Sequence, residues 1–210
     1  MPQVFSPNLD NPQVRLLRQA AAMLDNGGVG AIPTDSCYAL VCPLDDKSAV
    51  DRLRRIRGID ERHHLTLLCR DLSELANFAK VDNKQYRLLK NATPGPYTFI
   101  LEATREVPRR LSHPARKTIG LRVPDNAVAA ALLGLLDQPL LGTTLMLPGD
   151  ELPLNDAQHI VERLRKQVDF VIDGGACGTT PTTVVDLTGP EALLVRQGRG
   201  GLEALGLTPT

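Results

Sequence analysis

The sequence predicts an α/β fold in which helices pack on a mixed sheet of parallel and antiparallel strands. Early in the chain, apolar segments with strand and helix periodicity alternate, whereas strand-like segments follow one another near the end. Hydrophobic residues make up 42% of the sequence and charged residues 23%, as in water-soluble globular proteins with a sizeable core. No repeat, low-complexity tract or linker interrupts this pattern, so one domain is expected.

The first expected element is a helix over residues 12–25. Its apolar positions recur at helical spacing: Val14, Leu17, Ala21 and Leu24. Asn11 is the expected N-cap, Pro12 suits the first turn, and Gly27 suits the left-handed position after the last turn.

A β-rich run follows at residues 29–42. It is interrupted by residues 33–35, where Pro33 must occupy a strand end or a bend because it cannot donate to a ladder. A second helix is expected over 46–57, with Val50, Leu53 and Ile56 on its inner face.

The later elements are shorter. A buried strand is expected at 65–69, a helix beginning at Asp71 or Ser73, and a helix over 82–91 that the Pro-Gly-Pro stretch ends. Two more helices are expected at 126–136 and 155–167. The remaining strands are expected at 97–101, 119–123, 139–145, 169–173, 182–187 and 192–198.

The charge is balanced overall but unevenly distributed. A formal net charge of zero argues against a protein that coats nucleic acid without selectivity. Two segments are nevertheless rich in basic residues, one at 52–62 and one at 105–122. They could form a basic groove or a solvated surface, and charge alone leaves both interpretations open. Aromatic residues make up only 3%, which argues against a stacking platform for single-stranded RNA.

The cysteines and the lengths of the apolar runs indicate the cellular compartment in which the protein is expected. Cys37, Cys42, Cys69 and Cys177 have no CxxC spacing and no histidine at metal-ligand spacing, so each is expected to be a small core thiol. No apolar run reaches the length of a membrane span, and residues 1–13 lack a signal pattern. A cytoplasmic protein without membrane contact is expected.

Several common catalytic motifs are missing from the sequence. It contains neither GxxxxGK[ST] nor a strand-linked GxGxxG, and the glycines at 27–30 follow a helix instead of preceding one. HExxH and GxSxG are also missing, and His63 and His64 are expected to be loop or surface residues. Hydroxyls and guanidinium groups beside strand ends remain, a combination that favours anion recognition.

Five segments, in order, resemble the YrdC/YciO family. They are PTDSCYAL (33–40), TPGPYTFIL (93–101), TIGLRVP (118–124), PTTVVDL (181–187) and VRQG (195–198). The resemblance runs from about residue 12 to 200, which implies one YrdC-like domain over 12–200 with terminal extensions at 1–11 and 201–210. It also implies a twisted mixed sheet with flanking helices around a concave basic cavity.

The resemblance further implies a reaction. In this family threonine, bicarbonate and ATP give threonylcarbamoyl-adenylate and pyrophosphate, which serves the modification of adenosine 37 in tRNA. The resemblance assigns the nucleotide to Arg57, Thr118, Thr144 and Arg196. It assigns the amino-acid substrate to Thr34, Arg122 and Thr182. The expected cofactor is ATP with Mg²⁺, without a metal bound by the protein itself. Each of these side chains also has a purely structural interpretation, as a strand, turn or surface residue.

Two family signatures are altered in this chain. The KxRP signature corresponds to residues 57–60, where Arg57 stands for the lysine, Ile59 for the arginine and Asp60 for the proline. The PSAN signature corresponds to residues 143–146, where Met146 stands for the asparagine. Loss of a charge-assisted hydrogen bond to phosphate costs about 1.5–3 kcal/mol. We expect Ile59 and Met146 to face the same cavity, and these departures resemble the YciO branch.

Two functions therefore stay open. The first is a YciO-type protein that binds a nucleotide (ATP or AMP) and RNA, either double-stranded RNA or tRNA, without efficient synthase activity. The expected RNA contacts are basic: Arg54, Arg55, Arg109, Arg110, Arg116 and Lys117. The alternative is a working L-threonylcarbamoyladenylate synthase in which Arg57 replaces the lysine, because arginine also binds phosphate. The sequence does not set the oligomeric state.

Overall fold

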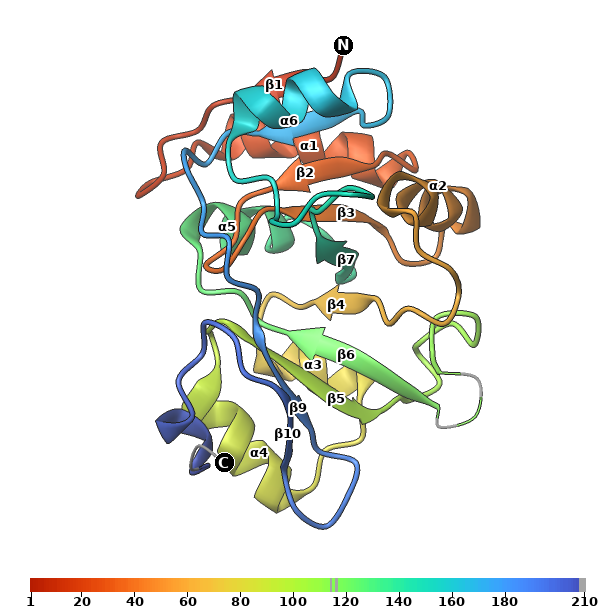
Figure 1. Cartoon of the computed structure of the whole chain (residues 1–210), viewed down its shortest axis with the longest axis vertical. Helices are drawn as coiled ribbons and strands as arrows, with labels where there is room; N and C mark the ends of the chain where they lie inside the picture. Colours follow the sequence, from red (N-terminus) through yellow and green to blue (C-terminus); the bar gives the residue numbers. More distant parts are fainter. Residues whose placement is uncertain (114, 116, 208–210) are drawn as a thin grey trace.

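Ten strands form one sheet in the computed structural model, which describes residues 1–113, 115 and 117–207 (Figure 1). The order across the sheet is β1-β8-β2-β3-β7-β4-β6-β5-β9-β10. The strands are β1 (Gln3–Phe5), β2 (Gly30–Ile32), β3 (Ala39–Pro43), β4 (Thr66–Leu68), β5 (Tyr97–Glu102), β6 (Thr118–Arg122), β7 (Leu140–Thr144), β8 (Phe170–Ile172), β9 (Thr183–Asp186) and β10 (Leu193–Arg196). Parallel pairs such as β4·β6 and antiparallel pairs such as β5·β6 both occur, so the predicted mixed sheet is confirmed.

In the described part of the chain, six α-helices lie between the strands, and a short 3₁₀-helix follows the last strand. They are α1 (Val14–Asp25), α2 (Lys47–Arg57), α3 (Leu72–Phe78), α4 (Asn83–Ala92), α5 (Ala127–Leu133), α6 (Ala157–Leu164) and η1 (Glu203–Leu205). Helices α2 to α6 each begin after an Asp or Asn whose side chain accepts a backbone N–H, which satisfies one of the free amides of the first turn. None of these described helices is long and apolar enough to cross a membrane.

Helix α1 begins later than expected. Its N-cap residue is Gln13, and the predicted cap Asn11 lies in a preceding turn, where its backbone N–H donates to Asn8 Oδ1 at 2.8 Å. An Asn side chain that closes a local turn competes with helix formation, and here the turn around Asn8 delays the start of α1.

Strand alternation divides the core between the two faces of the sheet. Residues such as Leu67, Phe99 and Leu121 point to one face, into the larger hydrophobic cluster with α2, α3, α4 and α6. On the opposite face, α1 and α5 pack together over the half of the sheet that contains β1, β8, β2, β3 and β7. These two helices leave the rest of that face uncovered.

The sheet extends beyond the segment expected to form the domain. Strand β1 lies within the predicted extension 1–11 and pairs with β8 in parallel, and Phe5 is buried against Phe170 with ring centroids 6.2 Å apart. The β-rich run 29–42 is two antiparallel strands, β2 and β3, separated by a loop at residues 33–38. That loop reaches the uncovered face.

Candidate functional site

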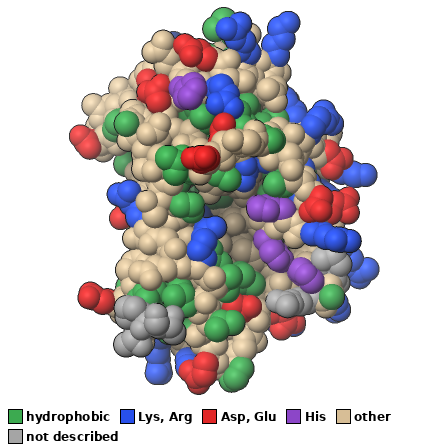
Figure 2. All heavy atoms as spheres, viewed as in Figure 1, with side chains coloured by type: hydrophobic (Ala, Val, Ile, Leu, Met, Phe, Trp, Pro, Cys, Tyr) green, Lys and Arg blue, Asp and Glu red, His purple; other side chains and the backbone are tan. Residues whose placement is uncertain are grey.

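A cavity of about 590 Å³ lies on the uncovered face of the sheet, and Figure 2 shows the molecule hollowed there. Its lining comes from strands β3, β4, β5, β6, β7, β9 and β10, together with two loops. The floor has little side-chain bulk because Thr66 pairs with Gly142 on one side and Gly120 on the other. A Cβ at Gly142 would lie 2.5 Å from Leu68 Cδ1, and one at Gly120 would lie 3.2 Å from Thr66 Oγ1, so the two glycines leave room for these neighbouring side chains.

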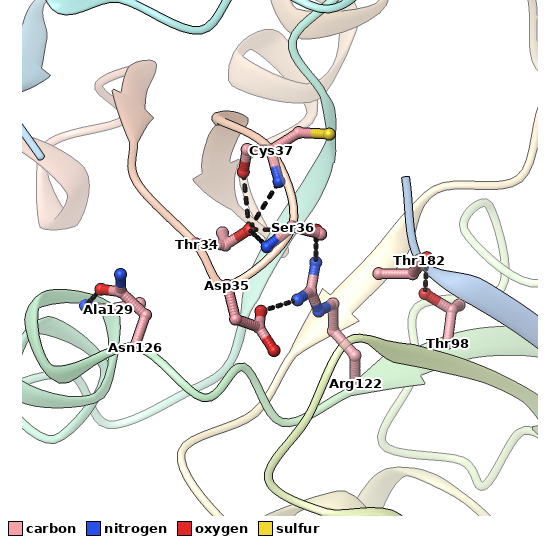
Figure 3. Close-up of polar contacts among 9 residues, drawn as sticks. All are labelled: Thr34, Asp35, Ser36, Cys37, Thr98, Arg122, Asn126, Ala129 and Thr182. Carbon is pink, nitrogen blue, oxygen red and sulfur yellow. Dashed lines mark hydrogen bonds and ion pairs between the residues drawn. The ribbon is translucent and has the colours of Figure 1, made fainter. Parts of the chain in front are cut away.

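The loop between β2 and β3 is shaped by one hydroxyl. Thr34 Oγ1 donates to the carbonyl oxygen of Cys37 at 2.6 Å and accepts from the backbone N–H groups of Ser36 and Cys37 (Figure 3). Ser36 and Cys37 line the cavity, whereas Thr34 lies behind them and is 4% exposed. The predicted substrate residue Thr34 therefore positions the loop that forms this wall.

Arg122 is a buried cation at the end of β6. Its guanidinium pairs with Asp35 through Nη2 and donates to Ser36 Oγ at 3.2 Å through Nη1 (Figure 3). The residue is 7% exposed, and this burial lowers the pKa of the guanidinium, an effect that Asp35 opposes.

The pair between Arg122 and Asp35 is incompletely satisfied. Arg122 Nε and Asp35 Oδ2 have no hydrogen-bond partner among the described residues, and both atoms are buried. A buried polar group left without a partner costs about 1–3 kcal/mol. Arg122 lines the cavity and so lies next to the space that a ligand would occupy, whereas Asp35 is not part of the lining.

Two hydroxyls meet on the far side of the cavity. Thr98 Oγ1 on β5 lies 2.8 Å from Thr182 Oγ1, just before β9, and both residues are buried (Figure 3). Arg196 on β10 donates to the carbonyl oxygen of Thr182, from Nη2 at 3.0 Å and Nε at 3.3 Å. Because each hydroxyl has one donor and two acceptor positions, the Thr98–Thr182 pair retains capacity for a ligand.

The predicted nucleotide and substrate residues only partly converge. Arg122, Thr182, Thr144 and Arg196 line the cavity. Thr118 shares strand β6 with Arg122 and is buried, but it is not part of the lining. Arg57, also outside the lining, is 8% exposed at the end of α2, and burial lowers the pKa of its guanidinium.

Ile59 and Met146 were expected to face the cavity, but neither residue does so. Ile59 packs against the larger hydrophobic cluster, and neither residue contributes to the lining. Thr144 does contribute, because strand alternation turns it to the uncovered face at the end of β7.

The predicted RNA contacts are scattered. Arg54 is buried, and its Nη1 donates to the carbonyl oxygens of Asp60 and His63, so this guanidinium is not available to RNA. Arg55 is exposed on α2, and Arg110 is exposed with Nη2 donating to the carbonyl oxygen of Leu44. Arg109 and Lys117 line a separate hollow of about 800 Å³. Arg116 lies outside the described residues.

Several lining residues were not predicted. Arg62, His63 and His64 reach the cavity from the loop before β4, and both histidines are exposed loop residues as expected. Thr98 and Ser36 were inside segments that carried the family resemblance but were not singled out. Period-2 alternation within 97–101 predicts which side chains share a face of the sheet. It does not predict which of the two faces is covered by helices and which lines a cavity.

The side chains give no metal-binding cluster. Within residues 1–113, 115 and 117–207, no group of three or more His, Cys, Asp or Glu side chains is placed to hold a metal ion. The cavity instead offers guanidinium groups and hydroxyls, which recognise anions.

Comparison with known proteins places these features in context. The family model described as Sua5/YciO/YrdC, telomere recombination, matches residues 22–198. The chain is 53% identical over 203 residues to YciO of Escherichia coli strain K12, covering 97% of this chain and 98% of that protein. The crystal structure of E. coli YciO superposes with a TM-score of 0.93 and covers 98% of this chain and 100% of that chain.

More distant relatives carry an enzyme's name. The human threonylcarbamoyl-AMP synthase is 32% identical over 181 residues, which cover 83% of this chain and 63% of that protein. The crystal structure of Pyrococcus abyssi Sua5 complexed with L-threonine has a TM-score of 0.85 at 26% identity. It covers 94% of this chain and 57% of that chain, so this chain spans just over half of Sua5.

Proposed function

Because the chain belongs to the Sua5/YciO/YrdC family, we propose that it binds an adenine nucleotide in the cavity and RNA on its basic surface, without efficient synthase activity. The main support for this proposal is the cavity, whose lining includes the buried cation Arg122. Its Nε has no hydrogen-bond partner among the described residues. A ligand with negative charge and several acceptors would satisfy such a site.

Separate parts of the cavity suit separate parts of the ligand. Arg196 and Thr144 would contact the nucleotide, and Mg²⁺ would arrive with ATP, bound to its phosphates. Arg122 and the Thr98–Thr182 hydroxyls would hold a small carboxylate-bearing group, such as the threonine named for the Sua5 complex. These roles follow from the chemistry of the lining side chains.

Weak synthase activity follows from what the altered signatures lack. Adenylation requires positive charge on the triphosphate and precise alignment of the attacking carboxylate. The aliphatic side chain of Ile59 packs against the apolar core, and the side chain of Met146 has no hydrogen-bond donor, so neither can replace the arginine and asparagine of the signatures. Each 1.4 kcal/mol removed from transition-state stabilisation slows the reaction about tenfold.

RNA binding is proposed on the exposed basic groups that remain. Arg55, Arg109, Arg110 and Lys117 are exposed, and such groups bind phosphates without reading bases. The low aromatic content is consistent with recognition of the backbone and shape of RNA.

The alternative remains L-threonylcarbamoyladenylate synthase. It is favoured by the 32% identity to the human synthase and by a cavity that is lined by Arg122 and Thr182 and has Thr34 directly behind its wall. Catalysis of adenylate formation would then depend on other cations near the phosphates.

Pyrophosphate release separates the two candidates. The chain is incubated with ATP, Mg²⁺ and bicarbonate, with and without threonine, beside a threonylcarbamoyl-AMP synthase as positive control. We expect release at the background rate in both mixtures because the phosphate-binding groups of the signatures are missing. Threonine-dependent release would contradict this proposal and establish the synthase.

A further inference from the structure

One wall of the cavity carries three basic side chains to which no role has been given. Arg62, His63 and His64 lie on the loop between α2 and β4, and all three line the cavity. In Figure 2 histidine side chains gather along one side of the hollow, with basic side chains near its other side. Arg196 on β10 lines the same cavity.

Hydrogen bonds from Arg54 and to Asp60 fix the backbone of the loop that carries these side chains. Gly58 ends α2 in the left-handed region with φ of 62°, and the buried Arg54 guanidinium donates to the carbonyl oxygens of Asp60 and His63. Asp60 Oδ1 accepts from the backbone N–H groups of Arg62 and His63 at 2.9 and 3.3 Å. A backbone fixed in this way presents its side chains at little further entropic cost on binding.

The surroundings of this wall are predominantly cationic. Burial lowers the pKa of His63, and Arg57, His64 and Arg54 lower it further, while Asp60 acts in the opposite direction. The His64 ring stacks on that of His113, with centroids 5.4 Å apart. An anion placed against His63 would offset the repulsion from these cations.

We propose that Arg62, His63 and His64 form an anion subsite that takes the phosphate chain of the nucleotide, which rests on the proposed nucleotide binding. Guanidinium and imidazole N–H groups donate to phosphate oxygens, and Arg62 can do so with two parallel bonds. The subsite would supply positive charge that Ile59 does not provide in the altered KxRP signature.

The subsite makes ligand binding depend on pH, with a defined sign. In the free protein, burial and the neighbouring cations hold the pKa of His63 below its ordinary value. A bound phosphate raises the pKa of His63, so binding takes up a proton and affinity rises as the pH falls. The rise ends once the pH is below the pKa of His63 in the free protein.

Calorimetric titration with inorganic tripolyphosphate, and separately with ATP, tests the subsite between about pH 5.5 and 8. The variants are Arg62→Gln, His63→Gln and His64→Gln, with His159→Gln as the matched control because His159 is exposed on α6 and does not line this cavity. At the low end of the range we expect each cavity variant to bind tripolyphosphate about tenfold more weakly, with a flatter pH profile for His63→Gln, whereas the control matches the parent.

The outcomes separate the subsite from the nucleotide proposal. Equal affinities and equal pH profiles in the parent and the three cavity variants would overturn the subsite, even if ATP binds. Histidine-dependent tripolyphosphate binding, with ATP bound no more tightly, would support the subsite and remove the nucleotide assignment. If the parent binds neither probe at any pH, both proposals are wrong. Thermal unfolding of each variant verifies that it is folded.

Discussion

Thr34 and Arg122 act on the same short loop, from opposite sides. Thr34 fixes the backbone of residues 34–37 through its hydroxyl, and Arg122 holds the side chains of Asp35 and Ser36 (Figure 3). A ligand that binds Arg122 would therefore also alter the surroundings of Asp35, because the two side chains form an ion pair. Each side chain also has one atom without a hydrogen-bond partner among the described residues. Two residues predicted as separate substrate contacts are thus one connected unit.

Cys37 gives a residue-level prediction because it lines the cavity yet is buried. Burial raises the pKa of its thiol to about 11, against the lowering effect of Arg122. At pH 8 only about one thiol in a thousand is then ionised, so alkylation by iodoacetamide should be about 100-fold slower than for a free cysteine. Mass spectrometry of the Cys37 peptide measures the rate, with the unfolded chain in denaturant as control. Equal rates in the folded and unfolded chains would contradict the buried position.

The strands position the cavity by register. Thr66 is flanked by Gly120 and Gly142 because β4 pairs with β6 in parallel and with β7 antiparallel. The sequence predicted most of these strands and the alternation within each. It could not predict the open floor, since that depends on pairing between segments far apart in the chain, as between Thr66 and Gly120.

The loop after α2 gives an element-level prediction. Gly58 has φ of 62°, and a Cβ there would lie 2.6 Å from Pro148 Cγ. Gly149 has φ of 86° with nothing within 4 Å of its Cβ position, so Gly149→Ala is the matched control for backbone strain alone. Gly58→Ala should lower the free energy of unfolding by about 1–2 kcal/mol from strain, and the clash with Pro148 should lower it further. Chemical denaturation measures the free energy of unfolding of both variants. Equal decreases in the two variants would show that Pro148 moves aside without a loss of stability.

At the scale of the whole molecule, the fold class and the family resemblance were accessible from the sequence, and both are confirmed. The composition of the site was less accessible. Arg54 and Arg55 are neighbours in the sequence, yet the helix turns one into the core and the other to solvent. Ile59 and Met146 show the same limit, because a position aligned with a ligand-binding residue need not reach the cavity.

RNA binding belongs to this scale because it depends on basic groups far apart in the chain. Filter binding of duplex RNA and tRNA across a salt series should give an affinity that falls steeply with salt. The double variant Arg109→Gln, Lys117→Gln should reduce the slope of log affinity against log salt by about one unit for each phosphate that is no longer neutralised. Arg87→Gln is the control, since Arg87 is exposed on α4 and lines neither hollow. A flat salt response of the parent would contradict RNA binding on this surface.

The most direct measurement is calorimetric titration of ATP with Mg²⁺ into the parent chain, Arg196→Gln and Arg87→Gln. Arg196 lines the cavity from an edge strand, where its guanidinium donates to the carbonyl oxygen of Thr182, so its replacement tests the cavity with little effect on the core. We predict saturable binding to the parent and to Arg87→Gln, and about tenfold weaker binding to Arg196→Gln, because a hydrogen bond to a charged phosphate is removed. Absence of binding to the parent, or equal affinity in all three proteins, would contradict nucleotide binding in this cavity.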